Sequence, residues 1–157
     1  MLQINVYMIG NRPPAWVTEG VEEYTKRLST EIKLQWRQFK QQNGTGAKKS
    51  DSDHCKVNKK LLAAIPKGFK IIALDERGES WSSLQVAARM NDWALNTGRV
   101  CILIGGPNGL SAECLRRADQ IWSLGPITLP HSLVRIILAE QLYRAFTINK
   151  GHPYHRE

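Results

Sequence analysis

Side chains suited to acid–base chemistry and to binding a polyanion gather near the C-terminus of the chain. Tyr154, His155 and Arg156 follow one another in the sequence. An aromatic ring can stack on an unpaired base, an imidazole changes protonation near neutral pH, and a guanidinium pairs with phosphate. Glu140 and Arg144 stand four residues apart, which places them side by side on a helix. Taken singly, a surface ion pair and a frayed terminus explain these residues as well.

Three segments rich in Gly, Pro or Thr form a second candidate site. They cover residues 74–78, 105–109 and 124–130, and each follows a segment with the pattern of a β-strand. In open α/β sheets, ligands bind beyond the carboxyl ends of the strands. Loops of this composition offer backbone N–H and C=O groups rather than charges. They therefore suit a neutral heterocycle such as adenine better than a triphosphate.

Common phosphate-binding and metal-binding motifs are missing from the sequence. No Gly-Lys-Ser/Thr follows the glycines, which excludes a P-loop, and the dinucleotide-binding pattern G-x-G-x-x-G is absent. Cys55, Cys101 and Cys114 are odd in number and widely spaced, which argues against a disulfide framework and a zinc site. We expect no metal, and we expect Cys101, within an apolar run, to be a packing residue.

The chain is basic, with a net charge of +8 and an isoelectric point near 9.6. Residues 40–70 alone hold eight lysines and two aspartates. Basic proteins attract polyanions through their summed field, so a nucleic-acid partner is indicated. A solvated helix face explains the lysine-rich segment equally well.

The elements that must position these residues follow from hydrophobic periodicity. A chain of 157 residues fits one domain over 1–157. Apolar runs too short for a membrane span and the lack of a signal-peptide pattern favour a cytoplasmic protein. Strands alternating with helices predict a mainly parallel sheet with helices on both faces. The expected strands are 2–9, 32–39, 69–74, 100–104 and 120–124. The expected helices begin after Pro14 and cover 51–65 (with Cys55 on its apolar side), 83–95, 111–118 and 131–148, with loops at 41–50 and 75–78.

Taken together, the motifs resemble the RlmH family, the 23S rRNA (pseudouridine-N3)-methyltransferases of the SPOUT superfamily. The resemblance covers essentially the whole chain and is most specific at its end. It rests on the segments Leu74–Gly78, Ile104–Leu110, Ser123–His131, Arg135–Ala145 and Pro153–His155. It implies an α/β SPOUT-type sheet flanked by helices with a C-terminal deep trefoil knot, which general topology rules would not predict.

The resemblance also implies a cofactor, a substrate and an assembly. The cofactor is S-adenosyl-L-methionine, the substrate is 23S rRNA in the ribosome, and the protein is a homodimer whose partner tail helps to complete the site. The long apolar helix 131–148, with a tail too short to fold back far on its own subunit, also favours a dimer. The cofactor contacts carried over from the family are Leu74, Gly105, Leu124, Gly125, Pro126, Ile127, Thr128 and Leu129.

Methylation of an imide nitrogen requires a group that accepts its proton or stabilises the resulting anion. For the proton, the candidates are His155, Tyr154 and Glu140, and we favour His155 with an arginine beside it. For the anion or for phosphate, the candidates are Arg135, Arg144 and Arg156. The tail is accordingly expected to serve catalysis and RNA capture rather than folding.

Two other functions stay open on the residues alone. A non-catalytic RNA-binding module would also be basic, but it would not bind S-adenosylmethionine. An enzyme of the dehydrogenase type would instead bind a nicotinamide cofactor. A thermal-shift screen with both cofactors separates the three, because a ligand at 100 times its dissociation constant stabilises by about 2.7 kcal/mol.

Overall fold

The computed structural model describes residues 1–28, 30–41 and 51–155. Of the expected loop at 41–50, only residue 41 is among the described residues. Arg156 lies outside them. The strands are β1 (Leu2–Ile9), β2 (Ile32–Phe39), β3 (Lys70–Ser80), β4 (Arg99–Ile104) and β5 (Gln120–Ser123). The helices are α1 (Ala15–Thr25), α2 (Asp51–Ala63), α3 (Ser83–Asn96), α4 (Ala112–Arg117) and α5 (His131–Lys150), followed by the 3₁₀ turn η1 (Pro153–His155).

The strands form one parallel sheet with the order β2-β1-β4-β3-β5. The central strands β1 and β4 are buried on both faces, which explains their nearly continuous apolar sequences. The predicted parallel sheet is confirmed. Because all strands run the same way, their carboxyl ends meet at one edge, where the three Gly- and Pro-rich segments begin.

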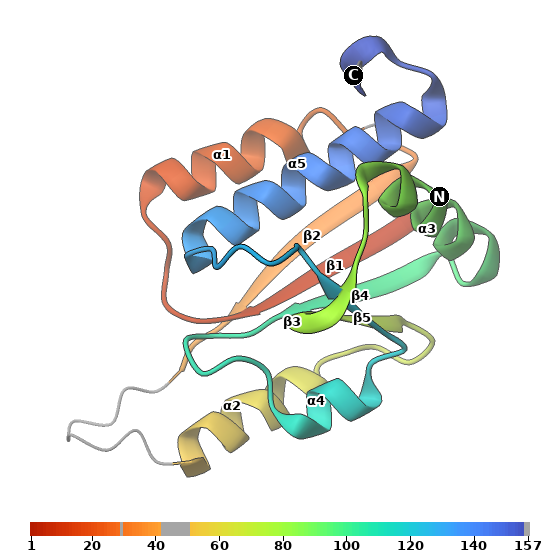
Figure 1. Ribbon diagram of the computed structural model, residues 1–157. Coiled ribbons are helices and arrows are strands. Elements are labelled where there is room, and N and C mark those ends of the chain that lie inside the picture. Colours follow the sequence, from red (N-terminus) through yellow and green to blue (C-terminus); the bar gives the residue numbers. More distant parts are fainter. Residues whose placement is uncertain (29, 42–50, 156–157) are drawn as a thin grey trace.

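Helices cover both faces of the sheet, as predicted (Figure 1). α1, α3 and α5 lie on one face, where Trp93, Leu138 and Leu142 are buried. α2 and α4 lie on the other face, over Leu61 and Leu103. α3 begins with a capping box, in which the Ser82 side chain accepts from the Gln85 backbone N–H and the Gln85 side chain accepts from the Ser82 backbone N–H. Two cores thus hold the sheet between two helical layers.

Two local predictions were wrong. Residues 75–78 were expected to form a turn, but they belong to β3. The strand bulges there, because Leu74 and Glu79 both lie opposite Trp122 of β5 and pairing resumes only at Glu79. Cys55 was expected on the apolar side of its helix, but it is exposed, whereas Cys101 is buried as expected. Burial raises the pKa of Cys101 to about 12, so this thiol is an inert packing group.

No helix in the described part of the chain is both long and apolar enough to cross a membrane.

Candidate active site

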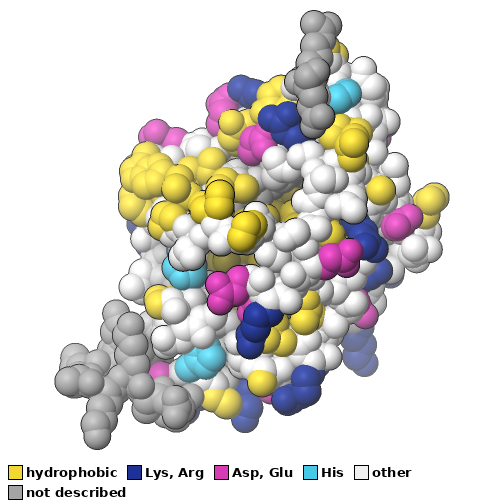
Figure 2. Space-filling view, viewed as in Figure 1, with side chains coloured by type: hydrophobic (Ala, Val, Ile, Leu, Met, Phe, Trp, Pro, Cys, Tyr) yellow, Lys and Arg dark blue, Asp and Glu magenta, His cyan; other side chains and the backbone are white. Residues whose placement is uncertain are grey.

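A pocket of about 580 Å³ opens at the carboxyl edge of β3, β4 and β5. The ends of these strands and the segments after them form its wall, and the start of α5 closes one side. Figure 2 shows this hollow near the centre of the molecular face. The wall includes Leu74, Gly105, Leu124, Gly125, Ile127, Thr128 and Leu129, but not Pro126. Seven of the eight residues expected at the cofactor thus line one cavity, together with residues of the other segments.

The segment after β4 turns back on itself within the pocket wall. Gly106 and Gly109 form an isolated bridge, and the Gly109 N–H donates to the Gly106 carbonyl at 2.9 Å. A Cβ atom on Gly105 would lie 2.5 Å from the carbonyl carbon of Gly109 and 2.6 Å from the backbone nitrogen of Leu110. Gly105 is therefore required by the shape of its own loop, whatever ligand the loop contacts.

Two side chains of α2, neither of them among the predicted site residues, hold this loop from outside. The His54 Nε2–H donates to the Gly109 carbonyl at 3.0 Å. Asn58, only 1% exposed, accepts from the Ser111 backbone N–H at 2.9 Å and from the Cys114 thiol at 3.4 Å, and its amide donates to the His54 carbonyl at 2.7 Å. α2 thus fixes the backbone where the pocket loop passes into α4.

Replacing Asn58 with alanine is expected to lower the free energy of unfolding by about 2 kcal/mol. The change leaves the Ser111 N–H without its acceptor and opens a small cavity between α2 and α4. Exposed Lys59 beside it is the matched control, and Lys59→Ala should stay within about 0.5 kcal/mol of the original protein. Urea unfolding measures the free energy of unfolding of both variants. Equal values would show that the hydrogen bonds of Asn58 do not stabilise the fold.

The pocket wall carries few charges: the ion pair of Asp75 with Arg77, the exposed carboxylate of Glu76, and the imidazole of His131. Arg77 binds Asp75 through its Nε and Nη2 atoms at 2.9 and 3.0 Å, which lowers the pKa of Asp75 and keeps this carboxylate ionised at neutral pH. Burial and the nearby Arg135 lower the pKa of His131, so its imidazole is neutral at neutral pH. A neutral heterocycle and a cationic group both suit such a wall.

The sequence placed Arg135 among the RNA-binding residues, but the structure buries it. Its side chain is 6% exposed, and a Cβ atom on Gly10 would lie 3.6 Å from its Nη2. No carboxylate among the described residues pairs with it, and burial lowers its pKa. The Arg135 side chain is thus covered in one chain, and its contact with RNA stays a prediction.

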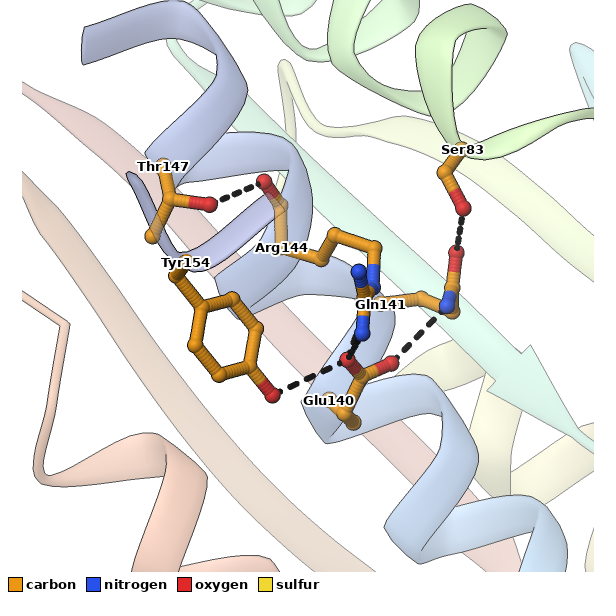
Figure 3. A network of polar contacts seen from close by, with 6 residues as sticks. All are labelled: Ser83, Glu140, Gln141, Arg144, Thr147 and Tyr154. Atoms are coloured by element: carbon orange, nitrogen blue, oxygen red, sulfur yellow. Dashed lines mark hydrogen bonds and ion pairs between the residues drawn. The ribbon is translucent and has the colours of Figure 1, made fainter. Parts of the chain in front are cut away.

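Further along α5, Glu140 is the centre of a polar network (Figure 3). Arg144 donates to its Oε1 from Nε at 2.8 Å and from Nη2 at 2.7 Å, and the Tyr154 hydroxyl donates to the same oxygen at 3.1 Å. The Gln141 amide donates to Oε2 at 2.8 Å, and Gln141 in turn accepts from the Ser83 hydroxyl at 2.8 Å. With three donors bound, Glu140 is an orienting group rather than a free base.

The tail packs on the C-terminal part of α5 of its own chain and does not reach the pocket. The rings of Tyr154 and Tyr143 are 4.6 Å apart in an edge-to-face arrangement, and the Arg144 guanidinium lies 5.1 Å from the Tyr154 ring centroid. Burial and the charge of Glu140 raise the pKa of Tyr154 to about 12. Tyr154 is therefore a protonated hydrogen-bond donor near neutral pH and contributes to packing.

His155 is the third candidate for the proton acceptor. Its Nδ1 is buried and has no hydrogen-bond partner among the described residues. The residues of the polar network and of η1 do not line the pocket. Glu140 lies nine residues beyond His131 of the pocket wall, which is about 13 Å along a helix rising 1.5 Å per residue. Within one chain, the predicted catalytic residues and the pocket are therefore separate.

No group of three or more His, Cys, Asp or Glu side chains suited to a metal ion occurs among the described residues. His54, beside Cys55 in the sequence, instead bonds to the pocket loop.

Comparison with known proteins identifies the class to which this sheet and pocket belong. A family described as predicted SPOUT methyltransferase matches residues 2–155. Two solved structures share the fold at a TM-score of 0.55. A probable methylase family protein from Haemophilus influenzae is 12% identical and covers 98% of this chain and 70% of its own. A probable methyltransferase from Bordetella pertussis is 14% identical and covers 92% and 96%. The molecule is thus of the SPOUT methyltransferase class.

Sequence relatives narrow this class further. A protein named ribosomal RNA large subunit methyltransferase H from Burkholderia ambifaria is 40% identical over 155 residues, or 99% of both chains. A protein of the same name from Paraburkholderia phytofirmans is 39% identical over the same extent. The chain belongs to the ribosomal RNA large subunit methyltransferase H family of SPOUT methyltransferases.

Proposed function

We propose that this protein transfers a methyl group from S-adenosyl-L-methionine to N3 of a pseudouridine in 23S rRNA of the ribosome. The proposal rests on the pocket that the three segments form at the carboxyl edge of the sheet. The chain that forms this pocket is a member of this methyltransferase family. One domain over residues 1–157, a trefoil knot around this edge and a cytoplasmic location are part of the same proposal.

The pocket fits the cofactor by volume and by chemistry. Its backbone-rich wall, including Gly105, Gly125 and Thr128, offers close approach to the adenosine part, while Glu76 adds an exposed carboxylate. When bound, S-adenosylmethionine supplies a methyl group on a cationic sulfonium. The tight turn that Gly105 permits brings the backbone of residues 105–110 into the wall, as expected for a ligand held by backbone atoms.

The protein residues then orient the base and remove its proton. We assign the proton acceptor to His155, because Tyr154 stays protonated and Glu140 is bound by three donors. Glu140 and Tyr154 position Arg144, whose positive charge stabilises the anion left on the base. Tyr154 anchors the tail so that His155 is presented at a fixed place.

A second copy of the chain is needed for these residues to meet the pocket, since in one chain they lie apart. We propose a homodimer in which the tail and network of one subunit complete the pocket of the other. Much of α5 is buried against the sheet of its own chain. The apolar residues of α5 are therefore not by themselves evidence for a dimer. On α1 and around the start of α5, the exposed large apolar side chains are Trp16, Ile127 and Leu133. Figure 2 shows hydrophobic atoms gathered over the region where Figure 1 places α1 and the start of α5.

Replacing Trp16 with glutamate is expected to weaken dimerisation at least about tenfold, because it places a charge in an apolar contact. Trp16 is 53% exposed in one chain. Leu95→Glu on α3, where the side chain is 85% exposed, is the matched control and should leave the dimer intact. Light scattering across micromolar concentrations measures both. A monomeric original protein would overturn the proposed assembly.

The proposed activity is tested with labelled S-adenosylmethionine and three acceptors: free rRNA, separate ribosomal subunits and whole ribosomes. We expect transfer to large-subunit RNA and binding of S-adenosylmethionine, but not of a nicotinamide cofactor, in a thermal-shift screen. Protein that binds RNA without binding S-adenosylmethionine would instead be a non-catalytic RNA-binding module.

A further inference from the structure

Charges are distributed unevenly between the two helical layers. On the layer of α1, α3 and α5, most described cations pair with a carboxylate, as in Lys26–Glu23, Arg89–Glu79 and Lys150–Glu31. On the layer of α2 and α4, exposed cations have no described carboxylate within ion-pair distance. These residues, which we call the basic surface, are Lys56, Lys59, Lys60, Arg116 and Arg117.

Local helix electrostatics explain only part of this surface. Lys60, Arg116 and Arg117 lie in the last turns of their helices, where cations interact favourably with the helix dipole. Lys56 and Lys59 lie further from that end, so the dipole does not account for them. Surface cations contribute little to the stability of the fold. A cluster of them attracts anions, so we expect the basic surface to bind an anion from outside the protein.

One end of the basic surface lies near the pocket, because Lys56 and Lys59 flank the residues of α2 that hold the pocket loop, while Lys60, Arg116 and Arg117 lie in the last turns of α2 and α4. His54 of α2 bonds to Gly109 of the pocket loop, and Asn58 bonds to Ser111 and Cys114 at the start of α4. Lys60 lies six residues beyond His54, about 9 Å along the helix axis. In Figure 2, dark blue side chains lie below the hollow, over the region where Figure 1 places α2 and α4.

We propose that the basic surface binds the phosphate backbone of rRNA beside the pocket. The proposal rests on the proposed function and specifies where the substrate lies. The basic surface consists of long, flexible Lys and Arg side chains, which bind phosphate groups. It has no aromatic ring on which a base could stack. It also lies on the layer opposite the exposed Trp16 of α1, and it therefore stays accessible in the proposed dimer.

The test neutralises three of these cations in the full-length protein, as Lys56→Gln, Lys59→Gln and Lys60→Gln combined. The matched control removes the same charge away from the layer of α2 and α4, through Lys26→Gln, Arg99→Gln and Lys150→Gln. For the first variant, we expect the dissociation constant for protein-free 23S rRNA to rise about ten- to hundredfold near 100 mM salt. The slope of log K against log salt should fall by about 2 to 3.

S-adenosylmethionine affinity and melting temperature should stay unchanged in both variants, and the control should keep the RNA affinity within about threefold. If both variants lose RNA affinity equally, net charge alone is responsible and the proposal is overturned. If the first variant binds protein-free rRNA normally but binds large subunits weakly, an acidic ribosomal protein is the partner, which also overturns it. Failure of the original protein to transfer methyl groups would instead refute the proposed function.

Discussion

Replacing Gly105 with alanine is expected to weaken S-adenosylmethionine binding by about 100-fold, equivalent to about 2.7 kcal/mol. The added Cβ would lie 2.5 Å from the carbonyl carbon of Gly109 and 2.8 Å from its Cα. Backbone atoms cannot rotate away as a side chain can, so the whole loop must open. Because this loop forms part of the pocket wall, its displacement changes the wall directly.

The neighbouring Gly106 is a matched control for this prediction. A Cβ there would lie 3.0 Å from the Cγ2 atom of buried Ile9 and 3.4 Å from its carbonyl oxygen, so Ile9 must shift by a few tenths of an ångström, which is less than the displacement needed at Gly105. Gly106→Ala should therefore change the affinity much less. Isothermal calorimetry measures binding, and a melting curve verifies that each variant is folded. Equal affinities for both variants would show that the contact with Gly109 has no effect on the pocket.

Replacing His155 with alanine is expected to reduce the methylation rate at least about 100-fold while S-adenosylmethionine affinity stays the same. A positioned acid–base group contributes about 10²–10⁴ in rate. His155 is the proton-acceptor candidate that is neither held protonated, like Tyr154, nor bound by three donors, like Glu140. Single-turnover rates with saturating ribosomes separate this effect from a loss of binding.

The tail offers two controls for His155. His152→Ala removes an exposed imidazole of the same tail, whose Nδ1 accepts from the Tyr154 backbone N–H at 3.2 Å, and should retain most of the rate. Tyr154→Phe keeps the ring on Tyr143 but loses the bond to Glu140, at a cost of about 1 kcal/mol in stability. If His155→Ala methylates ribosomes at the original rate, the proton leaves by another route, and the tail only packs.

The sequence predicted the sheet well because its strands carry strong, unambiguous patterns. β1 and β2 have the predicted bounds, and α3 begins at the serine pair that can form a cap. The error at residues 75–78 has a tertiary cause: Asp, Glu, Arg and Gly favour a turn locally, but pairing with β5 extends the strand. Cys55 was misplaced because it is apolar in type, although its position on α2 faces solvent.

For the site, the sequence predicted the segments that line the pocket, but it did not predict the side chains of α2 that fix the pocket loop. The role of Asn58 depends on contacts with Ser111 and Cys114, more than fifty positions away. A single Asn among the apolar residues of a helix was the one signal available for it. The burial of Arg135 was likewise hidden, because an arginine on an amphipathic helix usually faces water.

The strand order also determines when this protein can finish folding. β1 and β2 can pair once the first forty residues have been synthesised, but the second edge of β1 pairs with β4, with Gln3 opposite Arg99. Until β4 emerges, one edge of the most buried strand stays open, and open apolar edges template aggregation. Long-range parallel pairing is intrinsically slow. We therefore expect chains truncated before residue 99 to aggregate rather than to form a stable half-domain.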